Sequence, residues 1–126
     1  MHHLGRMKRI HLTIGDDGAP IKFFPDLIED CIMETEGVED VAVVGIPDDE
    51  KSSVPVAYVV SNLSDDEMRE RINEQCQRIS AYSRPVEIYF VDRLPQTAIG
   101  KTDILKLEKD AVIRRNQKDN VKTKKL

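Results

Sequence analysis

The glycine–lysine pair Gly100-Lys101 holds the side chain with the clearest chemical use in this sequence of 126 residues. It closes the segment 94–101, Leu-Pro-Gln-Thr-Ala-Ile-Gly-Lys, which lacks the glycine-rich start of a phosphate-cradling loop. Glycine adopts backbone conformations that other residues avoid, so Gly100 can present Lys101 outward. A lysine ammonium group is a compact point charge that suits a phosphate or carboxylate oxygen. From residue types alone, Lys101 either makes such a contact or simply begins the last helix.

A second group of charged residues lies near the beginning of the chain, in the segment Gly-Arg-Met-Lys-Arg at positions 5–9. These residues form either a solvated linker or part of a site for an anion. A metal site is not expected, because no cluster of Cys and His has the spacing of metal ligands. The pair His2-His3 lies apart from His11, the third histidine.

The two cysteines, Cys31 and Cys76, fall on the apolar stripes of two expected helices. A disulfide is one option, but the chain begins without the apolar segment of a secretory signal. We therefore expect two reduced thiols that pack in the core, and a cytoplasmic protein. No apolar stretch reaches the ~20 residues that a membrane-spanning helix needs, so no membrane span is expected.

The net charge of −4 is unevenly distributed. Residues 106–126 contain eight Lys or Arg and three Asp or Glu, a net +5, so the rest of the chain carries −9. A basic tail of this kind binds nucleic acid in some proteins and is a solvated helix end followed by a disordered terminus in others. The segment has no aromatic side chain to stack on bases, so we expect no nucleic-acid partner.

The first third of the chain predicts a β-hairpin followed by a helix. Residues 10–14 alternate apolar and polar side chains, as a half-buried strand does, and residues 21–24 resume an extended pattern. Turn signals, Asp-Gly and Pro, fill the positions between them. Pro25 suits the first turn of a helix, which should end near Gly37. The apolar face of this helix comprises Leu27, Ile28, Cys31 and Ile32.

The remaining elements complete a small sheet with helices on it. Residues 38–46 and 54–60 are rich in β-branched side chains, and the seven-residue loop between them indicates antiparallel pairing. The capping box Ser64–Glu67 begins a helix. A strand at 86–91, a loop at 92–102 and a helix from about Asp103 follow. This order predicts an α+β domain, with an N-terminal hairpin and a small three-stranded, mainly antiparallel sheet packed with helices.

Five short segments resemble, in order, the motifs of one family. They are Gly5–Lys8, Phe24–Glu29, Val41–Asp48, Val54–Val60 and Phe90–Lys101. They are similar to the motifs GRxK/D, xPxxIE, aAVVGxPD, xPxAfVV and fVdxLPxTxxGK of the adenylate-forming superfamily of acyl-CoA synthetases, peptide-synthetase adenylation domains and luciferases. Each motif is short, but the five together span about residues 5–111 and resemble the C-terminal domain of such a ligase.

The resemblance implies a two-step reaction in a two-domain enzyme. A small-molecule carboxylic acid attacks the α-phosphate of ATP, which is used with Mg²⁺, and the acyl-adenylate then passes its acyl group to the thiol of coenzyme A. A carrier protein or an amine is the alternative acceptor. The C-terminal domain is a lid that rotates about a hinge. The large N-terminal domain, which binds ATP and the acid, is missing from this sequence, so we expect the isolated domain to be inactive.

The resemblance also assigns residues and boundaries. Lys101 matches the catalytic lysine of adenylation, Arg6 the arginine that contacts the nucleotide, and Lys8 the hinge residue. Gly15 matches the glycine that lines the pantetheine tunnel for the thiol, and Gly18 competes with it for that role. The implied division is a hinge or linker remnant at 1–9, the lid at 10–112 and a basic, flexible tail at 113–126.

The sequence departs from the family pattern at three positions. Asp17 stands where relatives often have Arg, Ser52 where many have Gly, and Ile104 where an Arg often follows the catalytic lysine. Two other interpretations stay open beside the catalytic lid. The chain could be a stand-alone binding or regulatory module that kept the lid fold, or an unrelated small α+β interaction domain.

Overall fold

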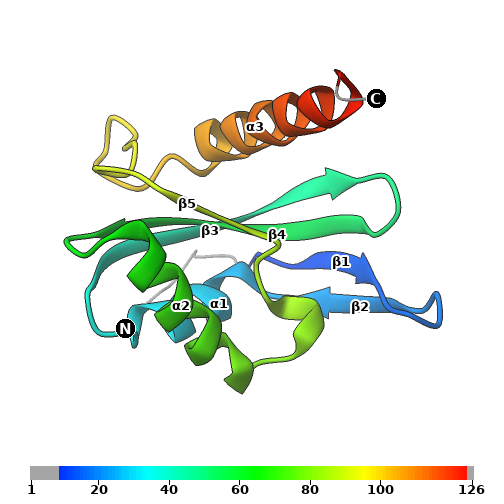
Figure 1. Cartoon of the computed structure of the whole chain (residues 1–126), viewed down its shortest axis with the longest axis horizontal. Helices are drawn as coiled ribbons and strands as arrows, with labels where there is room; N and C mark the ends of the chain where they lie inside the picture. The colour runs from blue at the N-terminus through cyan, green and yellow to red at the C-terminus, as the bar shows by residue number, and fades with distance from the viewer. Residues whose placement is uncertain (1–8, 125–126) are drawn as a thin grey trace.

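The computed structural model describes the backbone of residues 9–124 and the side chains of residues 9–116 (Figure 1). The predicted sites Arg6 and Lys8 lie outside these described residues. In chain order the elements are β1 (His11–Ile14), β2 (Pro20–Phe23), α1 (Pro25–Met33), β3 (Val38–Asp48), β4 (Ser52–Ser61), α2 (Asp65–Gln75), the short 3₁₀ helices η1 (Cys76–Arg78) and η2 (Ala81–Ser83), β5 (Glu87–Phe90) and α3 (Ile104–Lys124).

The strands form two separate sheets. β1 and β2 make the predicted antiparallel hairpin, and the second sheet has the order β3-β4-β5. β3 and β4 pair in antiparallel fashion over almost their whole length, as the short loop between them predicted. β5 instead runs parallel to β4, which requires a long crossover connection, and α2 with the two 3₁₀ helices supplies it. The α+β fold is thus confirmed, with β5 as the parallel strand of a mixed sheet.

The main sheet is buried on both faces, so its side chains divide between two cores. α1 and α2 cover one face and α3 covers the other (Figure 1). The alternating residues of β3 show the division clearly, since Val41 and Val43 face α1 and α2, whereas Ala42 and Val44 face α3. A sheet covered on both faces explains the nearly continuous apolar sequences of β3 and β4.

The helix starts follow the local chemistry of the chain. Pro25 lies in the first turn of α1, where its missing N–H group has no helical partner to lose. The Ser64 hydroxyl accepts a 3.3 Å hydrogen bond from the Glu67 amide at the start of α2, which is half of the expected capping box. The Glu67 carboxylate pairs with Arg71 at 2.8 Å rather than with the Ser64 amide.

Both cysteines are free and buried, in agreement with the expectation of reduced, packing thiols. Cys31 lies on α1 and Cys76 at the end of α2, so the two side chains come from the layer that covers one face of the sheet. Burial raises the pKa of the Cys76 thiol to about 11. A thiol with such a pKa is almost wholly protonated at neutral pH and is a poor nucleophile.

The last helix extends past the boundary that the resemblance implied between the lid and the tail. α3 continues to Lys124, so the boundary placed at residue 112 falls inside it. Arg115, beyond that boundary, lies 3.6 Å from the Asp48 carboxylate at the end of β3. The flexibility of the basic tail and the division of the chain into three parts stay predictions. Among the described residues, none of the helices combines the length and apolar character required to cross a bilayer.

Candidate functional site

Lys101 belongs to a tight turn whose backbone is fixed by Thr97. The Thr97 amide donates a 2.7 Å hydrogen bond to the Lys101 carbonyl, and the Gly100 amide donates to the Thr97 carbonyl at 2.9 Å. The Lys101 amide in turn reaches the Thr97 hydroxyl at 3.4 Å. Gly100 has a φ of 84°, in the left-handed region that favours glycine. Gly100 therefore reverses the chain directly before the lysine, as the sequence suggested.

The turn stands ahead of the last helix and is tied to the residue directly before that helix. Gln96 and Thr102 form an isolated antiparallel bridge, and the Asp103 amide donates to the Pro95 carbonyl at 2.8 Å. The Asp103 carboxylate then accepts from the Lys106 amide at 3.1 Å, which is helix capping. α3 begins at Ile104, so Lys101 is part of the turn and does not begin the helix.

The Lys101 side chain is exposed, and its ammonium group has no ion pair or hydrogen bond within the described part of the chain. A cleft of about 690 Å³ lies nearby, between β4, α3 and residues 91–96, but Lys101 does not line it. Three acidic and three basic side chains share the lining of the cleft, so it has no excess of either charge. Lys101 is thus a charge that projects from the surface, and it needs a second surface to form an enclosed site.

A polar cluster around the buried Tyr58 holds α3 against the sheet behind this turn. The Tyr58 hydroxyl on β4 donates a 2.5 Å hydrogen bond to the Asp110 carboxylate on α3. Arg114 pairs with the same carboxylate at 2.8 Å, and its guanidinium lies 4.9 Å from the centre of the Tyr89 ring. Burial and the neighbouring Asp110 raise the pKa of Tyr58 above its ordinary value, so the phenol remains a donor. The cluster keeps the helix that follows Lys101 in one position.

The two glycines predicted for the thiol tunnel lie in the turn of the β1–β2 hairpin. The Gly15 amide bonds to the Ala19 carbonyl at 2.9 Å, and a Cβ at Gly15 would lie 2.7 Å from the Ile21 side chain. Gly18 has a φ of 82° and open space where a side chain would be. The local structure of the turn thus explains why glycine occupies both positions. Their role toward a thiol stays a prediction.

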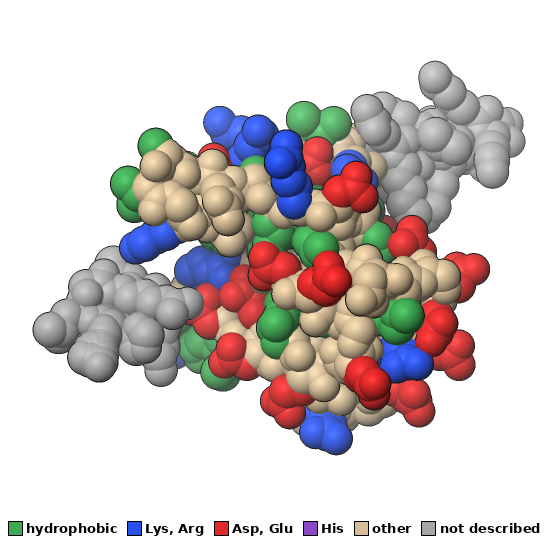
Figure 2. All heavy atoms as spheres, turned by 90° about the vertical axis from the view of Figure 1, so that its left-hand side faces the viewer, with side chains coloured by type: hydrophobic (Ala, Val, Ile, Leu, Met, Phe, Trp, Pro, Cys, Tyr) green, Lys and Arg blue, Asp and Glu red, His purple; other side chains and the backbone are tan. Residues whose placement is uncertain are grey.

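The lysine turn and the hairpin turn lie at opposite ends of the molecule (Figure 1). The structure therefore does not bring Lys101 together with Gly15 or Gly18 in one site. Figure 2 shows the end of the molecule that carries the lysine turn. Basic side chains gather in its upper half, at the level of α3 and the preceding loop, whereas acidic side chains predominate in its lower half, at the level of α2. The lysine turn thus lies in the more basic half of this end of the molecule.

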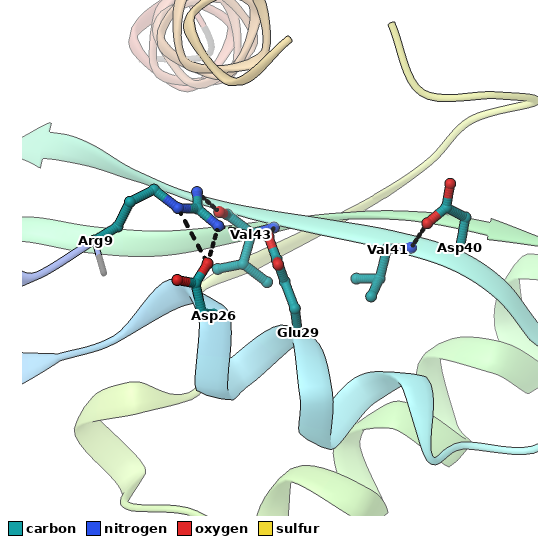
Figure 3. A network of polar contacts seen from close by, with 6 residues as sticks. All are labelled: Arg9, Asp26, Glu29, Asp40, Val41 and Val43. Carbon is teal, nitrogen blue, oxygen red and sulfur yellow. Dashed lines mark hydrogen bonds and ion pairs between the residues drawn. The ribbon is translucent and has the colours of Figure 1, made fainter. Parts of the chain in front are cut away.

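Arg9 belongs to the basic segment 5–9 noted in the sequence, but its contacts with the folded domain were not predicted. Its guanidinium contacts Asp26 and Glu29 on α1 and the backbone of Val43 on β3 (Figure 3). The sequence signal was the pair of acidic residues three positions apart on one helix face. That signal does not identify the partner of the acidic pair, because Arg9 lies 17 residues before Asp26 in the chain.

The described residues hold no group of three or more His, Cys, Asp or Glu side chains arranged to bind a metal ion. The lysine turn presents an exposed cation on a backbone that is held by hydrogen bonds. Such a group can offset negative charge on a phosphate or carboxylate that another surface brings to it.

Residues 27–101 match the family described as the AMP-binding enzyme C-terminal domain, and the match ends on Lys101. This match covers more than half of the chain, so the protein belongs to that family. The expected membership in the adenylate-forming superfamily is thereby confirmed.

Curated and solved relatives agree with this assignment. The 2-succinylbenzoate–CoA ligase of Listeria monocytogenes is 43% identical over 86 residues, which are 68% of this chain and 18% of that protein. An acyl-CoA synthetase from Brucella canis superposes with a TM-score of 0.71 at 27% identity, over 88% of this chain and 20% of that structure. An anthranilate CoA ligase solved with anthranoyl-AMP superposes with a TM-score of 0.66 at 26% identity, over 81% of this chain and 23% of that structure. The chain thus spans about a fifth of the length of the curated relatives that it matches.

Proposed function

We propose that this chain is the mobile C-terminal lid of an AMP-forming acid–thiol ligase, and that Lys101 is its catalytic residue for acyl-adenylate formation. The observation that carries the proposal is the lysine turn, in which the backbone of Lys101 is held by Thr97 and Gly100 while the ammonium group projects from the surface. The turn is the end of the family match. A lone exposed cation of this kind completes a site only when a second domain faces it.

In the first half-reaction a carboxylate oxygen attacks the α-phosphorus of ATP, and the bond from that phosphorus to the pyrophosphate oxygen breaks. Two anionic groups must approach each other, so the barrier falls when a fixed cation lies between them. Lys101 would supply that cation. The ATP is used with Mg²⁺, which shields the phosphate charge, and both would be bound by the large domain. Arg6 would contact the nucleotide.

In the second half-reaction the thiol sulfur attacks the acyl carbon, and AMP leaves. The opposite end of the lid, with Gly15 and Gly18, would then face the reaction centre. The separation of the two turns in the structure supports this assignment, because one rigid domain can offer each end in turn. Lys8 would be the hinge at which the backbone torsions change.

The partners follow from this scheme. The missing large N-terminal domain would bind the carboxylic acid and determine which acid is used. Coenzyme A is the proposed acceptor, since the relatives described above are named as CoA ligases or acyl-CoA synthetases. The whole protein would work in the cytoplasm. The 126-residue chain alone should release no pyrophosphate from ATP, because Lys101 has no substrate surface to meet.

The test uses Lys101→Ala in the complete ligase. Pyrophosphate release that depends on the acid should fall by at least about 10²-fold, while thioester formation from a supplied acyl-adenylate should persist. Lys109→Ala, which removes an exposed lysine of α3, is the matched control and should change neither step. Equal loss of both steps would show that Lys101 supports folding instead. Pyrophosphate exchange by this chain alone would favour a stand-alone activity over the lid.

A further inference from the structure

Arg9 binds the folded domain through every part of its guanidinium group. One terminal nitrogen, Nη1, donates to the Val43 carbonyl at 2.7 Å. The other, Nη2, donates to Asp26 Oδ1 and to Glu29 Oε2, both at 2.8 Å, and Nε donates to the same Asp26 oxygen at 3.3 Å. Figure 3 shows the side chain held between α1 and β3. A planar group fixed at three corners by two elements leaves its own backbone little freedom.

The same cluster satisfies the outer edge of β3. The Glu29 oxygen that pairs with Arg9 also accepts a 2.8 Å hydrogen bond from the Val43 amide. Both backbone polar groups of Val43 are therefore bound by side chains on the side of the strand away from β4. An edge strand normally leaves these groups to water or to another chain.

The cluster is charged and shielded from water. The side chains of Arg9, Asp26 and Glu29 are only 24%, 23% and 19% exposed. Burial raises the pKa of Glu29, although the Val43 amide and Arg9 both favour its ionised form. Removal of the guanidinium would leave two half-buried carboxylates beside each other without a cation, which is unfavourable.

We propose that Arg9 is a positioning residue that ends the hinge, because its side chain fastens the last residue of the segment 1–9 to α1 and β3. The inference rests on the proposed function and adds a residue to it. A change of the backbone torsions before Arg9 then moves the lid as one rigid body, so that Lys101 reaches one defined position. Without the clamp that these contacts form, the backbone after Arg9 would move relative to α1 and β3, and the same rotation would position Lys101 less well.

The first experiment measures backbone hydrogen exchange in this 126-residue chain. Arg9→Ala should speed exchange at least about tenfold, equivalent to about 1.4 kcal/mol, at residues 9–14 and at the Val43 amide, with little change in β4. Glu29→Gln should give a smaller change at the same places. Arg71→Ala is the matched control, because it removes the same charge from an exposed ion pair with Glu67. It should leave residues 9–14 unchanged.

Uniformly faster exchange through α1, β3 and β4 in Arg9→Ala would mean a general loss of stability and would overturn the clamp. Unchanged exchange at residues 9–14 would overturn it as well. Glu29→Gln keeps the size of the side chain, so it tests the same contacts even where Arg9→Ala folds poorly. This measurement needs no catalysis, so its failure is separate from failure of the proposed function.

The second experiment measures the two half-reactions in the complete ligase. Arg9→Ala should lower kcat for both steps by at least about tenfold, with the KM values for ATP and the acid unchanged. Arg9→Lys should recover part of the loss. A variant that only destabilises the lid would lose activity in parallel with its Tm. Full activity of Arg9→Ala at a temperature where it is folded would contradict a positioning role.

Discussion

The amide of Thr97 donates a 2.7 Å hydrogen bond to the carbonyl of Lys101 and so closes the turn that presents the lysine. The bond is made by main-chain atoms only, so it places the lysine backbone without using the ammonium group. The position of the charge then depends on the conformation of Gly100, the residue between these two partners that has a positive φ.

Gly100→Ala should therefore slow adenylation while the fold persists. An alanine at Gly100 meets no atom within 4 Å, so the cost is that of the left-handed conformation alone, about 1–2 kcal/mol. The turn should relax and displace Lys101, which should lower the rate of acyl-adenylate formation about tenfold or more in the complete ligase. Gly18→Ala is the control, since its φ of 82° and open surroundings match those of Gly100. An equal effect of both substitutions on adenylation would refute the prediction.

Ser52→Gly should stabilise the domain. Ser52 has a φ of 73° at the start of β4 and is the only described residue other than glycine with a positive φ. Glycine removes the cost of this conformation but gains freedom in the unfolded chain, so the expected net gain is up to about 1 kcal/mol. Thermal unfolding should show a Tm higher by a few degrees. Ser53→Gly, one residue later, should lower the Tm instead.

Tyr58→Phe should destabilise the face of the sheet that α3 covers. The substitution removes the 2.5 Å hydrogen bond to Asp110, and the side chain is only 1% exposed. The expected loss is about 1–2 kcal/mol in the free energy of unfolding, measured with urea. Tyr82→Phe removes an exposed hydroxyl that accepts a 3.4 Å contact from the Asp16 amide, and it should change stability by less than about 0.5 kcal/mol. The same loss in both variants would argue against the cluster.

The stability of the domain should fall below neutral pH because of His11. Burial lowers the pKa of His11 from its ordinary value, with Glu108 acting in the opposite direction and Arg9 in the same one. The unfolded chain then binds the proton more tightly than the folded one, so stability is complete above about pH 6.5 and is lost as the pH falls through the lower folded pKa.

The matched variant is His11→Phe, which keeps a ring against Phe23, now stacked at 5.3 Å, but has no proton to bind. As the pH falls from 8 to 5, the unfolding free energy of the natural chain should decrease relative to that of this variant. Comparison with the variant removes the contribution of Glu29, whose raised pKa acts with the opposite sign at lower pH. A difference that is constant over this range would contradict the prediction.

The sequence predicted the elements that depend on local chemistry. The hairpin, the helix after Pro25 and the antiparallel β3–β4 pair all have turn signals, periodicity or short loops that act over a few residues. The loop predicted at 92–102 contains the turn of Lys101, although residue types alone left open whether Lys101 begins the last helix. These features were accessible because neighbours in the chain determine them.

Features that join distant residues were not predicted. The parallel pairing of β5 depends on how α2 crosses the sheet, and nothing within residues 87–90 specifies its direction. The length of α3 is fixed in part by contacts such as that between Arg115 and Asp48. The Arg9 cluster joins residues 17 and 20 positions apart to the edge of a strand. Charged residues have many potential partners, and only the folded chain selects among them.

The two-sided burial of the main sheet gives the domain a mechanical property. Arg9 is bound to α1 and to the outer edge of β3, whereas the lysine turn is joined to α3, which covers the other face of the sheet. The hydrogen-bonded strands β3 and β4 form a rigid connection between these two positions. If the lid rotates about the proposed hinge beside Arg9, the displacement of Lys101 should grow with its distance from that hinge. A looser β3–β4 pair would let the domain bend during the rotation, and Lys101 would then be displaced less far.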